Sequence, residues 1–369
     1  MGYKTFKYRL YPSHAQAKNL LLILDTARQY YNMMLEDRKT AWEQEQRQVK
    51  KKDQLALVKR YRSTFPQAQQ VHSHVLQVAA DQVHKTFQAY FRRRKAKQQA
   101  GYPRFKSANR WHSIGFKEYG NGFRLDGRRL KVFGAGRISV RWHRPLEGTI
   151  KTCRIIYKAD QWWVSFTCEV AAPPQLPQTE QAVGIDVGIT PLLTTSTGEK
   201  VENPRFYWTA QQRLRRQQQQ LARAQKGSKS RAKKLLKVQR QHIHIANQRA
   251  DFAHKLSYTL VQHYDWIALE DLQIANMVRN HKLSKSILDA GWGRFKQLLT
   301  DKAASAGRVV VLVDPAFTSK TCSGCGATFE QLTLSDRWVD CGCGLSLDRD
   351  HNAAINILNR SGWDAPRTA

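Results

Sequence analysis

The sequence is poor in acidic residues, and this shortage limits the kinds of protein that it can encode. Asp and Glu number 29 against 61 Lys and Arg, which leaves a net charge of +32 over 369 residues. A folded chain with such an excess of cations requires a polyanionic partner, and nucleic acid is the first candidate, ahead of an anionic membrane surface. Hydrophobic residues make up 41% of the chain, which is enough for compact cores, so the charge does not belong to a disordered tail.

Long apolar runs are also missing. No stretch approaches the ~20 residues that a membrane-spanning helix needs, and the polar, alternating start of the chain does not resemble a secretory signal. Cysteine is scarce, with six residues of which four form one cluster, and this favours metal binding in a reducing compartment. We therefore expect an intracellular nucleic-acid-binding protein without a membrane segment.

The cysteine cluster lies near the carboxyl end as C-x2-C, fifteen intervening residues and C-x-C. Its four thiols are Cys322, Cys325, Cys341 and Cys343. Neighbouring glycines give the backbone the freedom to bring two sulfurs of each pair onto one ion, so the spacing predicts a tetrahedral zinc site. Two disulfides or four free thiols are the alternative interpretation. The second pair is one residue shorter than the commoner C-x2-C.

The amino-terminal half changes its hydrophobic period twice. Residues 3–10 alternate like a half-buried strand, and residues 12–98 carry helical stripes after a capping box at Ser13. Residues 113–170 return to a period of two with short turns, which predicts a small antiparallel β-barrel that residues 3–10 complete. The proline-rich residues 171–178 are the expected domain boundary.

Three carboxylates in the second half occupy well-defined positions. Asp186 lies between glycines on one face of a predicted strand, Glu270 ends a second predicted strand, and Asp350 opens a predicted helix. An acid in mid-strand is costly to bury, and converging carboxylates repel one another unless a divalent cation neutralises them. Their oxygens suit Mg2+ or Mn2+, and two such ions about 4 Å apart support phosphodiester hydrolysis. The nearby Asp348 and Asp271 are interpreted as a helix cap and a surface group.

The segment between Glu270 and the cysteine cluster predicts two regular elements. Residues 292–303 carry a helical stripe, and Val309–Val313 is a continuous aliphatic run. Because such runs are typical of strands covered on both sides, we expect a helix followed by a strand that is buried on both faces.

Two densely basic stretches carry much of the excess charge. One spans residues 91–106 and includes Tyr102 and Phe105, and the other spans residues 213–249, contains no acid and breaks at Gly227 like a helical hairpin. A charge run is usually a solvated face, but aromatic neighbours and missing counter-charges favour contact with a phosphate backbone. The residues expected to make this contact are Arg92, Arg93, Arg94, Lys95, Arg104, Lys106, Arg215, Arg216, Arg223, Lys233 and Lys234.

Three motifs resemble those of a known enzyme family. G-I-D-V-G-I-T at residues 184–190, I-A-L-E-D-L at 267–272 and L-D-R-D-H-N-A-A-I-N-I at 347–357 look like the active-site motifs of the RuvC-like branch of the RNase H fold. Their order around the cysteine cluster is similar to that of TnpB, the transposon-encoded RNA-guided DNA endonucleases related to type V CRISPR effectors. Residues 101–106 and 249–257 also resemble this family, so the resemblance covers nearly the whole chain. The C-x-C pair and a short tail depart from the family's usual pattern.

The resemblance implies a multidomain fold of α+β and α/β parts. A wedge β-barrel would carry an inserted helical recognition domain, and a RuvC-like nuclease domain of RNase H-like fold would carry an inserted zinc ribbon for target nucleic acid. The implied boundaries are residues 1–10 and 101–175 for the wedge, 11–100 for the recognition domain, 181–317 and 345–360 for the nuclease domain, 318–344 for the ribbon and 361–369 for the tail.

The same resemblance implies an activity and its ligands. Asp186, Glu270 and Asp350 would bind Mg2+ and act as the catalytic residues, and the four cysteines would hold structural zinc. The chain would be a metal-dependent, RNA-guided endonuclease that cleaves double-stranded DNA next to a short motif, and its guide RNA would derive from the transposon end. We expect one protein chain per guide RNA, in the cytoplasm of a bacterium or archaeon and associated with the nucleoid.

Other functions stay open on the sequence. A nuclease-dead relative would act as a guided DNA-binding repressor, although all three carboxylates are present. A nuclease or transposase of RNase H-like fold would act on transposon DNA without a guide, and a transposase would need its own end-binding domain. A structural basic protein with a zinc ribbon would have no use for three separately placed carboxylates.

Overall fold

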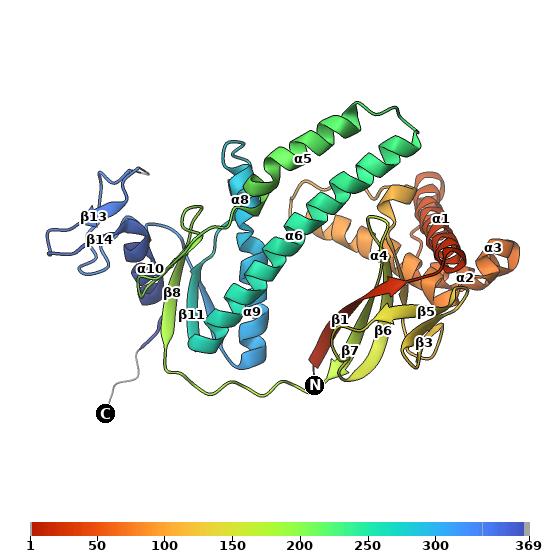
Figure 1. The fold of residues 1–369 in the computed structure, drawn as a ribbon, viewed down its shortest axis with the longest axis horizontal. Coiled ribbons are helices and arrows are strands. Elements are labelled where there is room, and N and C mark those ends of the chain that lie inside the picture. Colours follow the sequence, from red (N-terminus) through yellow and green to blue (C-terminus); the bar gives the residue numbers. More distant parts are fainter. Residues whose placement is uncertain (1, 334, 365–369) are drawn as a thin grey trace. The chain divides into compact units, whose positions relative to one another are not determined.

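Two units make up the chain, and each is built on its own β-sheet (Figure 1). The computed structural model describes residues 2–333 and 335–364, so residues 365–369 of the expected tail lie outside the described part. The first unit is Met1–Ala172 and the second is Pro173–Ala369, and their boundary falls within the proline-rich stretch. None of the helices in the described ranges is long and apolar enough to cross a bilayer.

The first unit combines a seven-stranded antiparallel sheet with a helical insertion. Its elements are β1 (Gly2–Tyr11), α1 (His14–Glu45), α2 (Lys51–Thr64), α3 (Pro66–Gln69), α4 (Ser73–Lys95), a 3-10 turn (Ala108–Arg110), β2 (Ser113–Phe116), β3 (Phe123–Asp126), β4 (Arg129–Val132), β5 (Gly136–Arg141), β6 (Thr149–Tyr157) and β7 (Trp162–Val170). The strand order is β2-β6-β7-β1-β5-β4-β3, so β1 occupies the centre of the sheet although the helices separate it from the other strands in sequence.

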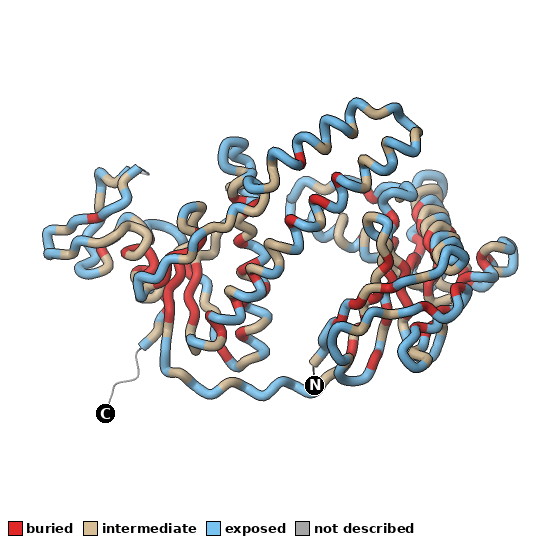
Figure 2. The backbone as a smooth tube through the Cα atoms, in the orientation of Figure 1, coloured by how far each residue is buried: buried red, intermediate tan, exposed pale blue. Residues whose placement is uncertain are grey.

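Helices and strands of the first unit share one hydrophobic core. Phe6 and Leu10 of β1, Leu24 of α1 and Leu76 of α4 belong to a single buried cluster. Figure 2 shows buried segments in both the strands and the helices of this unit. The capping box at Ser13 starts α1 as expected, because its side chain and that of Gln16 each accept the other's backbone N–H. The insertion therefore packs on the sheet instead of enclosing a core of its own, and the strand order, with β2 and β3 at its ends, is that of an open sheet.

The second unit contains a five-stranded mixed sheet, helices and a short hairpin. Its elements are β8 (Ala182–Val187), β9 (Leu193–Thr195), β10 (Lys200–Val201), α5 (Phe206–Ala222), α6 (Lys229–His263), β11 (Trp266–Glu270), α7 (Ile274–Met277), α8 (Ser284–Ala290), α9 (Trp292–Ala306), β12 (Val309–Val313), β13 (Trp338–Asp340), β14 (Ser346–Asp348) and α10 (Arg349–Arg360). The sheet order is β10-β9-β8-β11-β12. Strands β8, β11 and β12 are parallel to one another, β9 pairs antiparallel with β8, and β10 pairs antiparallel with β9.

The expectation that Val309–Val313 is buried on both faces is wrong. This strand, β12, lies at the edge of the sheet, where Val309 is 43% and Leu312 is 44% exposed. A continuous aliphatic run reflects a strong preference for extended backbone, and it does not report how many neighbours cover the strand.

Part of the proline-rich stretch is fixed to the second unit. The backbone N–H groups of Thr179 and Glu180 each donate to the carboxylate of Asp265 at 2.8 Å. The same carboxylate pairs with the buried Arg308, which also donates to the carbonyl of Pro177 at 2.7 Å. Since the N–H of Leu176 also donates to the carbonyl of Ala306, the chain is attached to the second unit from Leu176 onward.

Candidate active site and cysteine cluster

The register of two parallel strands brings Asp186 and Glu270 together. Pairing between β8 and β11 ends at Ile185 with Leu269, so the next step along both strands places the two carboxylates beside each other. Neighbouring strands lie about 4.8 Å apart, and equivalent positions point to the same face of a sheet. The two acids therefore meet at the carboxyl ends of parallel strands, where open α/β sheets bind their ligands.

Gly184 allows the third carboxylate to approach this face. A Cβ atom on Gly184 would lie 2.0 Å from the carbonyl oxygen of Ala354 and 2.7 Å from the amide nitrogen of Leu358, so α10 crosses β8 in backbone contact. Asp350 precedes Ala354 by about one helical turn, at the amino-terminal end of α10. Since Asp186 lies two residues beyond Gly184 on the same face, the close crossing brings the start of α10 toward Asp186.

The electrostatics of the site reflect this convergence. The pKa of Asp186 is raised to about 8, first by burial and then by the charges of Glu270 and Asp350, against the opposing effect of Arg349. Burial also raises the pKa of Glu270, although a hydrogen bond from the Thr318 hydroxyl partly offsets this effect. A buried acid whose proton affinity is raised further by two neighbouring carboxylates belongs to a site that a divalent cation would neutralise.

The two neighbouring acids have the structural roles predicted for them. Asp348 is the N-cap of α10, and its Oδ1 accepts two backbone N–H groups of the first turn, at 3.1 and 3.2 Å. Its Oδ2 pairs with Lys200 at 2.7 Å. Asp271 forms an ion pair with Lys296 at 2.9 Å, and its side chain is 49% exposed.

Three polar residues at the site were not predicted from the sequence. Thr318 donates its hydroxyl to Oε1 of Glu270, and Asn352 and Asn356 are buried in α10. The two asparagines lie four residues apart in a helix whose other inward positions are apolar, such as Ala353 and Ile357. Buried amides within an apolar helical face are the signal that could have identified them, because a buried polar group needs a partner.

The four cysteine sulfurs converge on one point. All four Sγ atoms lie within 4.8 Å of one another, with Cys322 and Cys343 at 3.7 Å and Cys325 and Cys341 at 3.5 Å. These separations are far longer than the ~2.05 Å of a disulfide, and the cysteines are free. Around a tetrahedral zinc ion with Zn–S bonds of about 2.3 Å, sulfurs lie about 3.8 Å apart. The disulfide interpretation is therefore wrong, and the cluster has the spacing of a metal site.

Backbone amides around Cys322 favour its thiolate. Burial alone would raise the pKa of this thiol, but N–H groups of Cys325 and Gly324 lower it below its ordinary value. In the shorter second pair, Asp340 accepts the hydroxyl of Ser346 and does not prevent Cys341 and Cys343 from reaching the other sulfurs.

The cations predicted to contact nucleic acid are mostly exposed. They lie at the end of α4, in the segment that follows it, on α5 and the turn after it, and on α6; of the eleven, only Lys106 and Lys234 are half-buried. Within the described ranges, none of them forms an ion pair with an acid. They therefore present unneutralised charge.

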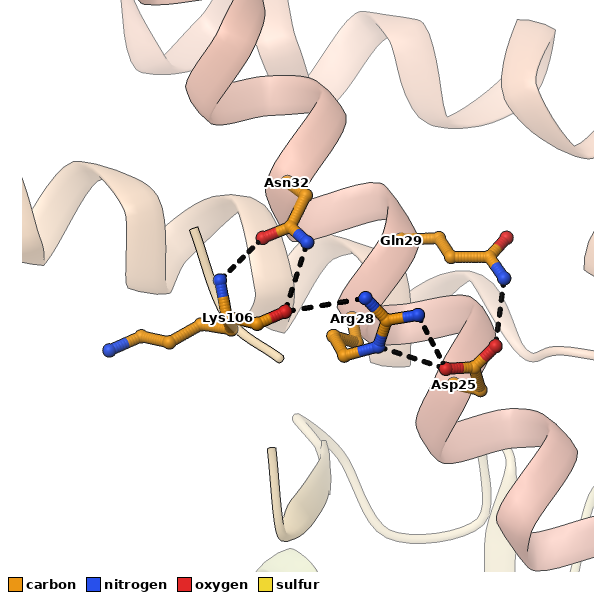
Figure 3. A network of polar contacts seen from close by, with 5 residues as sticks. All are labelled: Asp25, Arg28, Gln29, Asn32 and Lys106. Atoms are coloured by element: carbon orange, nitrogen blue, oxygen red, sulfur yellow. Dashed lines mark hydrogen bonds and ion pairs between the residues drawn. The ribbon is translucent and has the colours of Figure 1, made fainter. Parts of the chain in front are cut away.

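Lys106 is held by its backbone and not by its charge (Figure 3). Its N–H donates to Oδ1 of Asn32 at 2.8 Å, and its carbonyl accepts from Nδ2 of Asn32 at 3.0 Å. Arg28 also donates to this carbonyl and pairs with Asp25. The segment is thus fixed against α1, while the ammonium group of Lys106 extends away from this network.

The predicted basic hairpin is confirmed. Helices α5 and α6 pack side by side and are joined by a turn in which Gly227 has a φ of +83°. Arg231 donates to the carbonyls of Leu221 and Ala224 at 2.7 and 3.0 Å, which satisfies the carboxyl end of α5. Leu214 is the single buried residue of α5, so most of this helix faces solvent (Figure 2).

Comparisons with known proteins assign the chain to a family. A family described as a probable transposase, OrfB_IS605, matches residues 165–281, a Cas12f1-like TNB domain matches residues 292–357, and a helix-turn-helix domain matches residues 1–47. A protein of Streptomyces pristinaespiralis named as an RNA-guided DNA endonuclease is 38% identical over 363 residues, covering 96% of this chain and 88% of the relative. The chain belongs to the TnpB family of RNA-guided DNA endonucleases.

Other members and solved structures agree with this family assignment. InsQ of Escherichia coli K12, also named as an RNA-guided DNA endonuclease, is 30% identical over 304 residues, covering 78% of this chain and 74% of InsQ. The solved Cas12f1-sgRNA-target DNA complex contains a chain with a TM-score of 0.67 at 13% identity, covering 97% of this TnpB-family chain and 99% of that one. The structure of CRISPR-Cas phi3, a mini-RNA-guided endonuclease, has a TM-score of 0.50 at 10% identity, with 99% and 93% coverage. These two structures support the multidomain fold.

The amino-terminal family match does not correspond to a helix-turn-helix in this structure. Residues 1–47 contain β1 and the single 32-residue helix α1, and β1 forms the centre of the sheet. The segment therefore contributes to the first unit's core, and its described residues 2–47 do not form the two short helices of an end-binding motif.

Proposed function

We propose that this chain is an RNA-guided endonuclease that hydrolyses both strands of double-stranded DNA next to a short motif. The observation that carries the proposal is the convergence of Asp186 and Glu270 through strand register, with α10 and Asp350 brought to the same face by Gly184. The chain's relatives are named as RNA-guided DNA endonucleases, and part of the chain matches a family described as a probable transposase. Both findings support an association with a mobile insertion sequence.

The residues of the carboxylate site fit divalent cations such as Mg2+ or Mn2+. Their donors are carboxylate oxygens, and the raised pKa of Asp186 indicates that the opposing charge of Arg349 does not balance burial and the two neighbouring carboxylates. Cations bound by Asp186, Glu270 and Asp350 would activate water and stabilise the leaving 3′ oxygen. The protein's own contribution is to fix three oxygen donors on the rigid ends of β8, β11 and α10.

The cysteine cluster fits a structural zinc ion. Four sulfurs at tetrahedral separations leave no open position for a substrate, which is the arrangement of structural sites as opposed to catalytic ones. The loop returns through β14 directly into α10, so a zinc site there would stabilise the segment that precedes Asp350.

The proposed partners are inferred from the chain's positive charge and from its family. We propose a guide RNA derived from the transposon end and a double-stranded DNA target, with base pairing as the source of sequence specificity. The unpaired cations of α4, α5 and α6 would bind phosphates of the guide and heteroduplex. The same proposal divides the first unit into a wedge domain and a recognition domain. It also includes one protein chain per guide RNA and a location in the cytoplasm near the nucleoid.

The test begins with the protein expressed together with its flanking DNA. A high ratio of absorbance at 260 to 280 nm, and sequencing that finds one abundant RNA with a variable end, would support the guided function and supply the target for a cleavage assay with Mg2+. Asp186→Ala should abolish cleavage and retain RNA and DNA binding, whereas the matched control Asp271→Ala, which removes the exposed neighbour of Glu270, should cleave normally. Protein with only random RNA fragments, or a cleaving Asp186→Ala, would refute the proposal.

A further inference from the structure

The entrance to the cysteine loop contacts the carboxylate site directly. Thr318, the first residue of the T-S-K-T-C segment, is 4% exposed and donates its hydroxyl to Oε1 of Glu270. The same hydroxyl also contacts the carbonyl of Pro315 at 3.2 Å, which fixes the rotation of the side chain. One residue therefore belongs at once to the loop that leads to Cys322 and to the environment of a proposed metal ligand.

A second set of hydrogen bonds joins the same loop to α10. The amide of Asn356 donates to the carbonyls of Thr318 and Thr321, at 2.9 and 2.6 Å. Four residues earlier, Asn352 donates to the carbonyl of Thr321 and accepts from the N–H of Ser323, both at 2.8 Å. Ser323 directly follows Cys322, so these bonds reach the backbone of the first cysteine pair.

The burial of these groups gives the connection its strength. Asn352 is fully buried and Asn356 is 6% exposed, so bulk water could not replace a missing hydrogen-bond partner. Each amide bonds to the loop backbone, and the loop cannot move without breaking several bonds in the interior. The loop from Thr318 to Ser323 is thus held between β11 and the helix that carries Asp350.

We infer that Thr318 and Asn356 are positioning residues for the carboxylate site, and that through them zinc binding at the four cysteines raises the affinity of the carboxylates for divalent cations. This inference rests on the proposed function, since it takes Asp186, Glu270 and Asp350 as metal ligands. Zinc orders the loop, the loop orients Glu270 and braces α10, and the carboxylates are then preorganised for their cation. The coupling is reciprocal, so occupancy of either site favours the other.

The test measures Mn2+ binding to the full chain by the electron paramagnetic resonance signal of free Mn2+, with zinc content and unfolding temperature recorded for each protein. Asp186→Ala defines the background outside the carboxylate site. Thr318→Val is nearly isosteric but lacks the donor, and it should weaken carboxylate-site binding roughly tenfold, since a hydrogen bond to a charged group is removed. Thr318→Ser keeps the donor and should restore the affinity. Thr321→Val is the matched control, because its hydroxyl bonds to the carbonyl of Phe317 and not to Glu270.

The same Mn2+-binding measurement tests whether the carboxylate site depends on zinc. Removing zinc from the wild type with a chelator should weaken Mn2+ binding at least as much as Thr318→Val does. In Asn356→Ala protein, where the brace between α10 and the loop is already absent, zinc removal should have a much smaller further effect.

The outcomes separate this inference from the proposed function. If Thr318→Val with unchanged zinc content binds Mn2+ like the wild type, or if zinc removal leaves the affinity unchanged, the coupling is refuted while the carboxylate site stands. If the wild type itself shows no more binding than Asp186→Ala, the proposed metal site fails, and the coupling that depends on it fails too. An equal loss of affinity in Thr318→Ser and Thr318→Val would assign a packing role to Thr318 and refute the positioning role.

Discussion

The second unit contains two candidate metal centres that are assembled in opposite ways. The four cysteines come from one segment of 22 residues, in which two tight turns place the sulfurs together. The three carboxylates are separated by 84 and 80 residues, and they lie toward the same face only because two strands are in register and a helix crosses one of them. The first centre depends on local geometry and the second on the whole sheet.

This difference predicts different responses to damage. Loss of the cysteine centre should leave the sheet folded, since its ligands come from one loop, whereas the carboxylate centre should be sensitive to any change that shifts α10 or β11. Thr318, Asn352 and Asn356 connect the two, so damage to the local centre should also reach the carboxylates.

Loss of a zinc ligand should have the largest effect on stability. Cys322→Ser removes the most buried of the four thiols, and structural zinc sites contribute ~10 kcal/mol or more of apparent binding free energy. We expect loss of bound zinc and rapid proteolysis within residues 318–344, with the sheet of the first unit intact. Cys153→Ser is the control, because Cys153 is a buried cysteine of the first unit's core and should leave the zinc content unchanged. A stable, zinc-loaded Cys322→Ser would contradict the four-thiol site.

A single added methyl group should disrupt the carboxylate centre. Gly184→Ala places Cβ against the backbone of α10 at 2.0 Å, so the helix must move, at a cost of about 3 kcal/mol in the free energy of unfolding and with loss of cleavage. Gly342→Ala is the matched control in the local centre, because a Cβ there meets no atom within 4 Å although the residue lies between two cysteines. Chemical denaturation and the cleavage rate measure both effects, and a fully active Gly184→Ala would show that α10 does not need this close approach.

The same contrast explains what the sequence could reveal. The convergence of the four cysteines, the Ser13 capping box and the basic hairpin follow from local signals, and the structure confirms all three. The edge position of β12 and the common core of helices and strands in the first unit depend on which elements meet, and periodicity does not contain that information.

The carboxylate site could be predicted from the sequence only in part. Asp186 and Glu270 were identified as costly acids in strands, but only the register shows that they are neighbours. Thr318 could not have been identified, because a threonine before a cysteine pair has many possible partners and its bond to Glu270 is a tertiary interaction across 48 residues.

The pH dependence of cation binding should distinguish the carboxylate centre from an ordinary acidic surface. The pKa of Asp186 is raised from 3.8 to about 8, by burial first and then by Glu270 and Asp350. A raised folded-state pKa favours the protonated, metal-free protein at low pH, and this stabilisation disappears as the pH rises through about 8. Mg2+ must displace the proton, so its affinity should fall roughly tenfold per pH unit below this value and level off above it.

Thermal unfolding with and without Mg2+ from pH 6 to pH 9 measures this dependence. The stabilisation by Mg2+ should grow with pH in the wild type, and Asp186→Asn should abolish the trend because it has no proton to release. A wild-type Mg2+ effect that is constant across this range would show that Asp186 is ionised without the metal.

The smallest effects should come from the basic helices, which belong to neither centre. Arg215 and Arg216 are exposed on α5, and no acid pairs with them in the described part of the chain. Replacing both with Gln should weaken RNA binding several-fold and lower the slope of log affinity against log salt by about 0.7 to 0.9 for each phosphate that is no longer neutralised. Lys255→Gln on α6 is the control, since that lysine already pairs with Asp251 at 2.8 Å. Zinc content and the cleavage rate of the saturated complex should not change, because these cations bind phosphates and do not shape either metal centre. An unchanged salt slope would place the RNA on another surface.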